Sequence, residues 1–220
     1  MEPFEYQPPG PGLRVLYFDK DIVVVDKPAG LLSVPGRGAN LADSVLSRLQ
    51  CEYPTALTVH RLDMDTSGVM VFALRRKAEK ELKRQFRERE VEKTYTARVW
   101  GLVEPEEGVI AFPLAHDLEN KPKSKVCLTH GKASETRYRV MERDHETTWL
   151  TLMPVTGRSH QLRVHLMALG HPILGDRFYS SGAALTAASR LMLHASTLSV
   201  KQPYQGQRLQ FESPHSALVD

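Results

Sequence analysis

The pattern of apolar and polar residues predicts short strands along most of the chain. The runs LRVLYF and DIVVVDKP, within residues 13–28, are rich in β-branched and aromatic residues, and the turn formers Asp19-Lys20-Asp21 separate them. They predict a hairpin. Further runs of this kind predict strands at residues 69–74, 94–99, 109–111, 134–140 and 148–152, and the tail from Leu191 is strand-like.

Helical spacing of apolar residues occurs in three segments. Residues 41–49 predict a short amphipathic helix with Asn40 as its cap, and residues 77–89 predict a helix that is apolar on one side and basic on the other. A third helix is expected after Gly157 and ends at Gly170, because a glycine followed closely by proline terminates helices.

Strands outnumber helices and do not alternate regularly with them. This order predicts an α+β protein built on a mixed, largely antiparallel sheet with flanking helices and loops. Residues 1–12 are rich in proline and glycine and predict a flexible N-terminal arm. Residues 13–220 are expected to form a single catalytic domain or two intimately packed subdomains, with no internal repeat and no dinucleotide-binding fingerprint.

Composition narrows the class of protein. The chain has 220 residues, 41% of them hydrophobic, so it can bury a core without a disulfide or a metal ion. Cys51 and Cys127 lack metal-binding spacing and are expected to be two buried thiols in a reducing compartment. No signal peptide and no apolar run of about 20 residues is present, so we expect a cytoplasmic protein without a membrane partner.

Charge is concentrated in one segment of the chain. The net charge is only +3, but the stretch from Arg75 to Arg89 carries eight Lys or Arg residues against three Glu. Mixed charges on an exposed helix face usually serve solubility and pairing along the helix, whereas a basic face can also bind RNA. The sequence leaves both interpretations open.

The segment HRLDMDTSG, residues 60–68, gathers several groups that can carry chemistry. It places His60, Arg61, Asp63 and Asp65 in a loop between apolar stretches, and such loops often carry function. The alternative is an ordinary turn in which Asp63 or Asp65 accepts hydrogen bonds from nearby backbone N–H groups.

A second group of polar residues occupies the start of the third predicted helix. His160 and Arg163 are three residues apart and share a face, and Gln161 and His165 share another. A helix N-terminus with two arginines, Arg158 being the other, attracts an anion such as phosphate or a carboxylate like that of Asp63. The alternative is a solvated polar face.

These motifs together resemble a known family. Five segments are similar, in the same order, to motifs of the RluA family of RNA pseudouridine synthases. They are HRLDMDTSG at residues 60–68, KTY at 93–95, TGRSHQLRVH at 156–165, GHPILGDRFY at 170–179 and LMLHA at 191–195. The resemblance covers about residues 14–215. It implies an enzyme that breaks the N-glycosidic bond of a uridine and rejoins the base through C5, without a cofactor or a metal ion.

The resemblance also implies roles for individual residues. Asp63 is expected to be the catalytic carboxylate, Arg163 to pair with it, and Tyr95 to stack on the target uracil and take the C5 proton. Arg61 is expected to enter the RNA near the vacated base. Other expected RNA contacts are His60, Lys27, Arg158 and His160. For Lys83, Arg84 and Arg87, an RNA contact is expected from the charge of the predicted basic helix and not from the resemblance.

Two features favour the dual-specificity members of the family. These act on the tRNA anticodon stem-loop, at uridine 32, and on 23S rRNA, at uridine 746. Met64 stands where much of the family has lysine, and no S4-type RNA-binding domain precedes the catalytic unit. Asp65 departs from the alanine expected there and could raise the pKa of Asp63 if both carboxylates point inward. We expect a monomer.

The sequence alone leaves two alternatives to a pseudouridine synthase. The sequence Asp63-Met64-Asp65-Thr66 resembles the DxDx(T/V) loop of magnesium-dependent phosphatases of the haloacid dehalogenase type, although His60-Arg61 precede it instead of an apolar strand. A non-enzymatic RNA-binding or ribosome-assembly protein would need only a basic surface. It would not explain Asp63, Tyr95 and Arg163 as a set.

Overall fold

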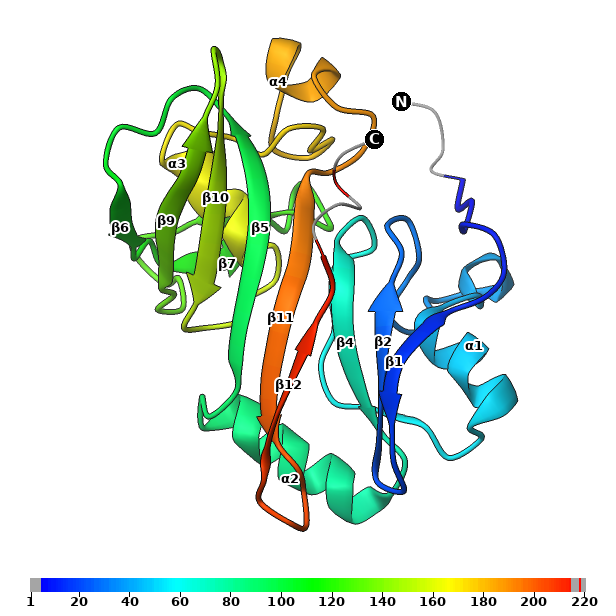
Figure 1. Cartoon of the computed structure of the whole chain (residues 1–220). Helices are drawn as coiled ribbons and strands as arrows, with labels where there is room; N and C mark the ends of the chain where they lie inside the picture. Colours follow the sequence, from blue (N-terminus) through cyan, green and yellow to red (C-terminus); the bar gives the residue numbers. More distant parts are fainter. Residues whose placement is uncertain (1–4, 215–217, 219–220) are drawn as a thin grey trace. The chain divides into compact units, whose positions relative to one another are not determined.

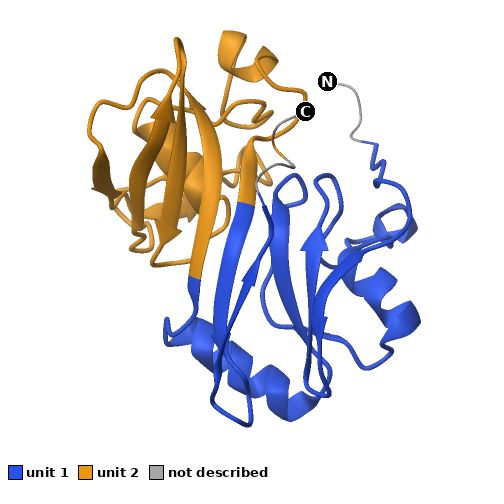
Figure 2. Ribbon diagram, viewed as in Figure 1, with its two compact units in different colours: residues 1–92, 195–214 blue, residues 93–194, 215–220 orange. Residues whose placement is uncertain are grey.

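The structure is a computed structural model that describes residues 5–214 and residue 218. The chain divides into two compact units, coloured separately in Figure 2. Unit 1 comprises residues 1–92 and 195–214, and unit 2 comprises residues 93–194 and 215–220. Among the described residues, no helix has the length and apolar character needed to cross a lipid bilayer.

Unit 1 is built on antiparallel strands (Figure 1). Its strands are β1 (Arg14–Phe18), β2 (Ile22–Lys27), β3 (Leu57–Thr58), β4 (Ser67–Ala73), most of β11 (Leu193–Lys201) and β12 (Arg208–Glu212). Their order is β1-β2-β4-β11-β12, and the short β3 also pairs with β4. The helical segments are the 3₁₀ turn η1 (Ala39–Leu41), α1 (Val45–Glu52) and α2 (Arg76–Arg87).

The core of unit 1 forms around β2 and β4. Every residue of β4 is buried, which agrees with its nearly continuous apolar sequence. Val69 and Val71 of β4 pack in one cluster with Ala78 and Leu82 of α2. This apolar side of α2, predicted from its spacing, holds the helix against the sheet and leaves the basic side outward.

The prediction for the first helix is wrong at its start. Asn40 lies in η1, and α1 begins only at Val45. Ser44 is the N-cap, since its hydroxyl accepts from the N–H of Ser47 at 3.1 Å and the Ser47 hydroxyl accepts from the N–H of Ser44 at 2.8 Å. This reciprocal pair satisfies two N–H groups of the helix start, which a cap at Asn40 could not do for a helix that begins five residues later.

The described part of the N-terminal arm contacts unit 1. Residues 5–12 form no helix or strand, as the composition predicts. Tyr6 donates its hydroxyl to the carbonyl of Asp43 at 3.0 Å, and Arg48 donates to the carbonyls of Pro9 at 2.7 Å and Gly10 at 2.8 Å. These contacts argue against free motion of residues 6–10, whereas residues 1–4 lie outside the described part.

Unit 2 has a second set of antiparallel strands. They are β5 (Glu92–Trp100), β6 (Glu107–Ile110), β9 (Thr136–Arg143) and β10 (Thr147–Pro154), in the order β5-β10-β9-β6, while β7 (Leu114–His116) and β8 (Ser124–Val126) form a separate pair. The helices are α3 (Gln161–Ala168) and α4 (Gly182–Thr186). Leu162 and Leu166 of α3 pack with Leu150 and Leu152 of β10 in the core of this unit.

The fold class predicted from the sequence is confirmed. The described strands pair mainly antiparallel, few helices flank them, and the strands predicted at residues 69–74, 94–99, 109–111, 134–140 and 148–152 appear as β4, β5, β6, β9 and β10. The cysteines depart from expectation, because Cys51 is exposed and Cys127 is partly buried, and both are free.

Replacing Gly68 with alanine should destabilise unit 1. Gly68 has a φ of 112°, and a Cβ there would lie 2.2 Å from the carbonyl oxygen of Ala195 in β11. Both the backbone conformation and the space exclude a side chain, so Gly68→Ala should lower the free energy of unfolding by about 2 kcal/mol or more in urea titrations. Gly10→Ala is the control, since nothing lies within 4 Å of its added Cβ. An equal effect of both substitutions would contradict this account.

Candidate active site

Asp63 lies in the loop that joins β3 to β4 in unit 1. Its side chain is partly buried, and its backbone carbonyl accepts from the N–H of Thr66 at 3.2 Å. The loop therefore does contain a turn, with Met64 and Asp65 at its centre. A backbone hydrogen bond thus closes the turn that begins at Asp63.

The residue before Asp63 is fixed by a serine from another loop. The Ser33 hydroxyl donates to the carbonyl of Leu62 at 2.7 Å and accepts from the N–H of Leu62 at 3.1 Å. Ser33 and Leu62 are both buried. Two hydrogen bonds to one residue fix both its peptide groups, so the chain enters Asp63 in a defined direction.

The residue after Asp63 is fixed from the end of β2. Lys27 donates from Nζ to the carbonyl of Met64 at 2.7 Å and to that of Pro28 at 2.9 Å, and the N–H of Gly30 donates to the same Met64 carbonyl at 2.9 Å. Together with Ser33, these contacts clamp the backbone on both sides of Asp63.

The predicted contact of Lys27 with RNA phosphate is wrong. The side chain is 0% exposed and its ammonium is bound to backbone carbonyls inside unit 1. A buried charge is tolerated only when polar groups replace its hydration, which these carbonyls do. Lys27 therefore organises the Asp63 loop instead of contacting the substrate.

The flanking residues His60 and Arg61 differ in their surroundings. The Nε2 atom of His60 accepts from the N–H of Val71 at 3.1 Å, and its ring stacks on Phe86 of α2 with centroids 4.6 Å apart. These contacts favour the structural interpretation of His60. Arg61 is exposed, so its side chain is accessible to a ligand, while Asp65 is partly buried.

In unit 2, Tyr95 lies on β5. It is the cross-strand partner of Leu152 on β10, and its partly buried ring packs against the core of the unit. The ring thus has a rigid support on one side and remains partly accessible, which is what a base-stacking platform requires.

Arg163 is among the most deeply buried side chains of unit 2. It is 2% exposed on α3, and Nε and Nη2 donate to the two carboxylate oxygens of Asp176, each at 2.7 Å. The rings of Phe178 and Tyr179 lie 5.1 Å and 5.2 Å from the guanidinium carbon. A forked ion pair and two aromatic contacts fix the orientation of the guanidinium.

Asp176 is a functional candidate that residue patterns alone did not identify. It occurs in the motif GHPILGDRFY, but nothing in the local sequence indicates that it binds Arg163, 13 residues earlier. One of its oxygens also accepts from the N–H groups of Phe178 at 2.9 Å and Tyr179 at 3.2 Å. Asp176 thus ties the arginine and the two rings together.

Arg158 and His160 lie in the loop that leads into α3. His160 has a φ of 55° and precedes the helix as its N-cap residue without a side-chain cap. Its Nδ1 is 2.7 Å from the Tyr179 hydroxyl, which also accepts from the N–H of Ser124 at 2.8 Å. Arg158 is exposed, and its side chain donates to the carbonyl of Ala133 at 3.4 Å. Of the two, Arg158 is the more accessible to RNA.

The interpretation of Gln161 and His165 as a solvated face is wrong. Both are buried. Gln161 donates from Nε2 to the carbonyl of Glu135 at 2.9 Å, and the two ring nitrogens of His165 bond the Thr136 hydroxyl and the Phe112 carbonyl, each at 3.0 Å. Burial lowers the pKa of His165. These side chains anchor α3 within unit 2.

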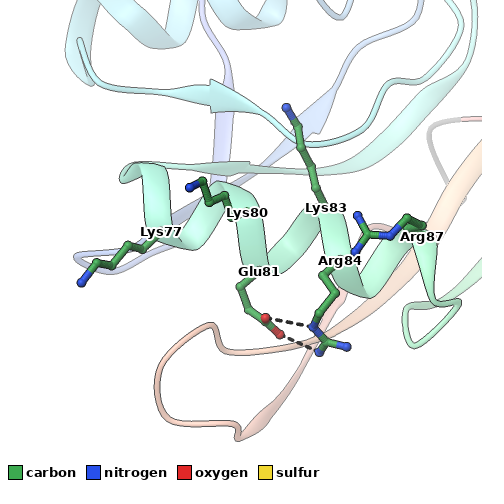
Figure 3. Close-up of a pocket in the computed structure, with 6 residues that line it drawn as sticks. All are labelled: Lys77, Lys80, Glu81, Lys83, Arg84 and Arg87. Atoms are coloured by element: carbon green, nitrogen blue, oxygen red, sulfur yellow. Dashed lines mark hydrogen bonds and ion pairs between the residues drawn. The ribbon is translucent and has the colours of Figure 1, made fainter.

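The basic side of α2 forms an open hollow on unit 1, shown in Figure 3. Arg84 donates to Glu81, Glu88 and Glu90, which raises the pKa of Arg84 and lowers that of Glu90 to about 2. Since three carboxylates occupy this guanidinium, the structure argues against the predicted RNA contact of Arg84. The other residues that line the hollow are Lys77, Lys80, Lys83 and Arg87.

Lys77 and Lys80 make no hydrogen bond or ion pair to any part of the chain between residues 5 and 214. Lys83 is paired with Glu79 at 2.7 Å, and Arg87 with Glu88 at 3.4 Å. The hollow therefore presents uncompensated positive charge mainly through Lys77 and Lys80, which are not among the residues predicted to contact RNA. No group of three or more His, Cys, Asp or Glu residues in the described ranges is placed to hold a metal ion.

Removing the Asp176 charge should destabilise the protein strongly. Asp176→Asn takes away the carboxylate that binds buried Arg163, and breaking a buried pair typically costs about 3–5 kcal/mol. The free energy of unfolding in urea measures this effect. Glu107→Gln is a matched control, because Glu107 pairs with Arg139 where both side chains are about 70% exposed and the loss should stay below about 1 kcal/mol. Equal losses would contradict the positioning role.

Comparison with known proteins identifies the family. The model of the RNA pseudouridylate synthase family matches residues 21–168. The dual-specificity RNA pseudouridine synthase RluA of Escherichia coli K12 is 56% identical over 211 residues, which cover 95% of this chain and 96% of that protein. RluA of Yersinia pestis is 57% identical over 199 residues, covering 90% and 97%.

A solved structure agrees with this assignment. Human RNA pseudouridylate synthase domain containing 1 superposes with a TM-score of 0.78 at 29% identity, covering 94% of this chain and 86% of that one. Membership of this family disfavours both the phosphatase and the non-enzymatic alternatives. The chain therefore belongs to the RluA family of RNA pseudouridine synthases, isomerases that convert uridine to pseudouridine in RNA.

Proposed function

We propose that this enzyme modifies two RNAs, uridine 32 in the tRNA anticodon stem-loop and uridine 746 in 23S rRNA. Relatives that are 56% identical over 95% of the chain carry the name of a dual-specificity enzyme, which supports two substrates. The anticodon stem-loop offers an unpaired loop, where a base leaves its stack most easily. Action as a monomer in the cytoplasm is part of the same proposal.

Asp63 is the catalytic carboxylate in this proposal. The observation that carries it is the clamp on the backbone carbonyls of Leu62 and Met64, because such fixing holds a reacting group in one geometry. The carboxylate attacks C1′ of the sugar, attacks C6 of the base, or removes the C2′ proton. These three routes share the requirement for an ionised Asp63.

Tyr95 and Arg163 complete the catalytic set. Tyr95 stacks on the target uracil, and its phenolic oxygen, once it has released its own proton, takes the C5 proton in the last step. Arg163 is proposed to pair with Asp63 and so to favour the ionised carboxylate. The contacts of Arg163 with Asp176 and two rings support this role, because a guanidinium fixed in this way is already oriented before substrate binds.

The surrounding RNA is held by exposed basic groups. Arg61 and Arg158 are proposed contacts near the target nucleotide, with His160 beside Arg158. Lys83 and Arg87 on α2, joined by Lys77 and Lys80, are proposed contacts to the RNA backbone farther from the target. Phosphate contacts of this kind position the substrate and make binding dependent on salt.

Substitution of Asp63 should abolish chemistry while sparing binding. Asp63→Asn and Asp63→Ala should reduce tritium release from a C5-labelled uridine in an anticodon stem-loop to below about one thousandth of the wild-type rate. The dissociation constant of the RNA should change by less than about threefold, since phosphate contacts dominate affinity. Turnover by Asp63→Ala at a wild-type rate would reject Asp63 as the catalytic carboxylate.

The two lysines of α2 should contribute to the salt dependence of RNA binding. Replacing Lys77 and Lys80 together by glutamine should lower the slope of log affinity against log salt by about 1–2, the effect of two lost phosphate contacts. The exposed Lys20, in the turn between β1 and β2, provides the single-site control. An unchanged slope in the double variant would mean that α2 faces solvent in the complex.

A further inference from the structure

Lys93 of unit 2 has an unusual environment for a lysine. It lies on β5 and is partly buried. Burial lowers the pKa of Lys93, and no hydrogen bond or ion pair to its ammonium exists within residues 5–214 and 218. Lys27 and Arg163, by contrast, are bound by carbonyl or carboxylate groups. A desolvated charge without a partner costs free energy, so its retention calls for a ligand.

The ammonium of Lys93 lies beside the loop that leads into α3. A Cβ added at Gly157 would be 3.4 Å from Nζ of Lys93, so the ammonium lies next to the backbone of Gly157. Gly157 itself is exposed, as is the following residue Arg158. An anion bound at this exposed loop would therefore lie close to Nζ.

Lys93 also has a fixed relation to Tyr95. Residues two apart on a strand point to the same face, and their Cα atoms are separated by about 6.4–6.8 Å. Both belong to β5. A nucleotide whose base stacks on the Tyr95 ring thus carries its sugar and phosphate along the same face as the ammonium. Pairing of a stacking ring with a cation is common where single-stranded RNA is bound.

We propose that Lys93 binds a phosphate of the RNA next to the nucleotide that stacks on Tyr95. The anion supplies the missing partner, and partial burial strengthens the attraction by excluding water. This inference rests on the proposed stacking role of Tyr95. It concerns binding of the RNA backbone and leaves the chemical step to other residues.

The first test separates a binding role from a structural one. Lys93→Met removes an uncompensated charge, so it should raise the melting temperature by about 2–4 °C at neutral pH. The pKa of Lys93 is lower in the folded than in the unfolded protein. The free energy of unfolding of the wild type therefore rises as the pH increases from the folded pKa to the unfolded pKa. The advantage of Lys93→Met should therefore shrink as pH approaches 10.5, the ordinary lysine value. A less stable Lys93→Met would overturn the claim that the ammonium lacks a partner.

The second test locates the phosphate. Affinities are measured in an Asp63→Asn background for anticodon stem-loops that each carry one neutral methylphosphonate near the target. Lys93→Met should bind the unmodified RNA about 10- to 100-fold more weakly, with a salt slope smaller by about 0.7. At one position, the methylphosphonate should weaken the affinity of the protein that retains Lys93. The same methylphosphonate should not weaken the affinity of Lys93→Met any further. Lys125→Met is the control, since Lys125 is exposed and paired with Asp117.

The outcomes distinguish this inference from the proposed function. If the enzyme with Asp63 intact converts the stem-loop, but Lys93→Met binds it as tightly as the parent, the Lys93 site is wrong and the function stands. The same holds if every methylphosphonate weakens both proteins equally. If the enzyme neither binds nor converts the stem-loop, the proposed substrate is wrong, and the inference that depends on it falls as well.

Discussion

The buried ammonium of Lys27 is the interaction on which the candidate active site depends most. Lys27 is the last residue of β2, and its cross-strand partner on β4 is Gly68. The absence of a side chain at Gly68 also lets β4 approach Ala195 closely. From this position the ammonium binds the Met64 carbonyl and fixes the chain just after Asp63. The buried charge of Lys27 thus holds the loop around Asp63 in one conformation and supports its carboxylate.

Buried cations serve different purposes in the two units. Lys27 is satisfied by backbone carbonyls and shapes a loop, whereas Arg163 is satisfied by Asp176 and held between two rings. In both, internal partners stabilise the charge before any substrate arrives. Among residues 5–214 and 218, Lys93 has no such partner, and this difference is the reason to assign it to a ligand instead of to the fold.

The strands could be predicted from the sequence because runs of apolar and β-branched residues favour a strand without help from distant parts of the chain. The apolar run of β4 and the β-branched residues of β2 specify strands wherever they occur. The start of α1 was missed, since Asn40 and Ser44 are both good caps and only the hydrogen bonds of Ser44 with Ser47 decide between them. The division into two units was open for a similar reason, because each unit combines distant segments of the chain.

The site was less accessible to sequence reasoning. Lys27 occurs beside a loop rich in glycine and proline and was interpreted as a phosphate contact, because nothing local reveals that its side chain is buried. Asp176 was overlooked as the partner of Arg163 because tertiary folding brings them together. Residue patterns alone left Asp63 between a turn and catalysis. The family resemblance supplied the roles of Tyr95 and Arg163, which remain predictions.

A structure of the enzyme bound to an anticodon stem-loop tests the central claim most directly. With Asp63→Asn to prevent turnover, the target uridine should lie outside its base stack, with its C1′, C2′ or C6 atom about 3–3.5 Å from the side chain at position 63. The Lys27 ammonium should still bind the Met64 carbonyl. A target uridine bound away from residue 63 would contradict the assignment of Asp63 as the catalytic carboxylate.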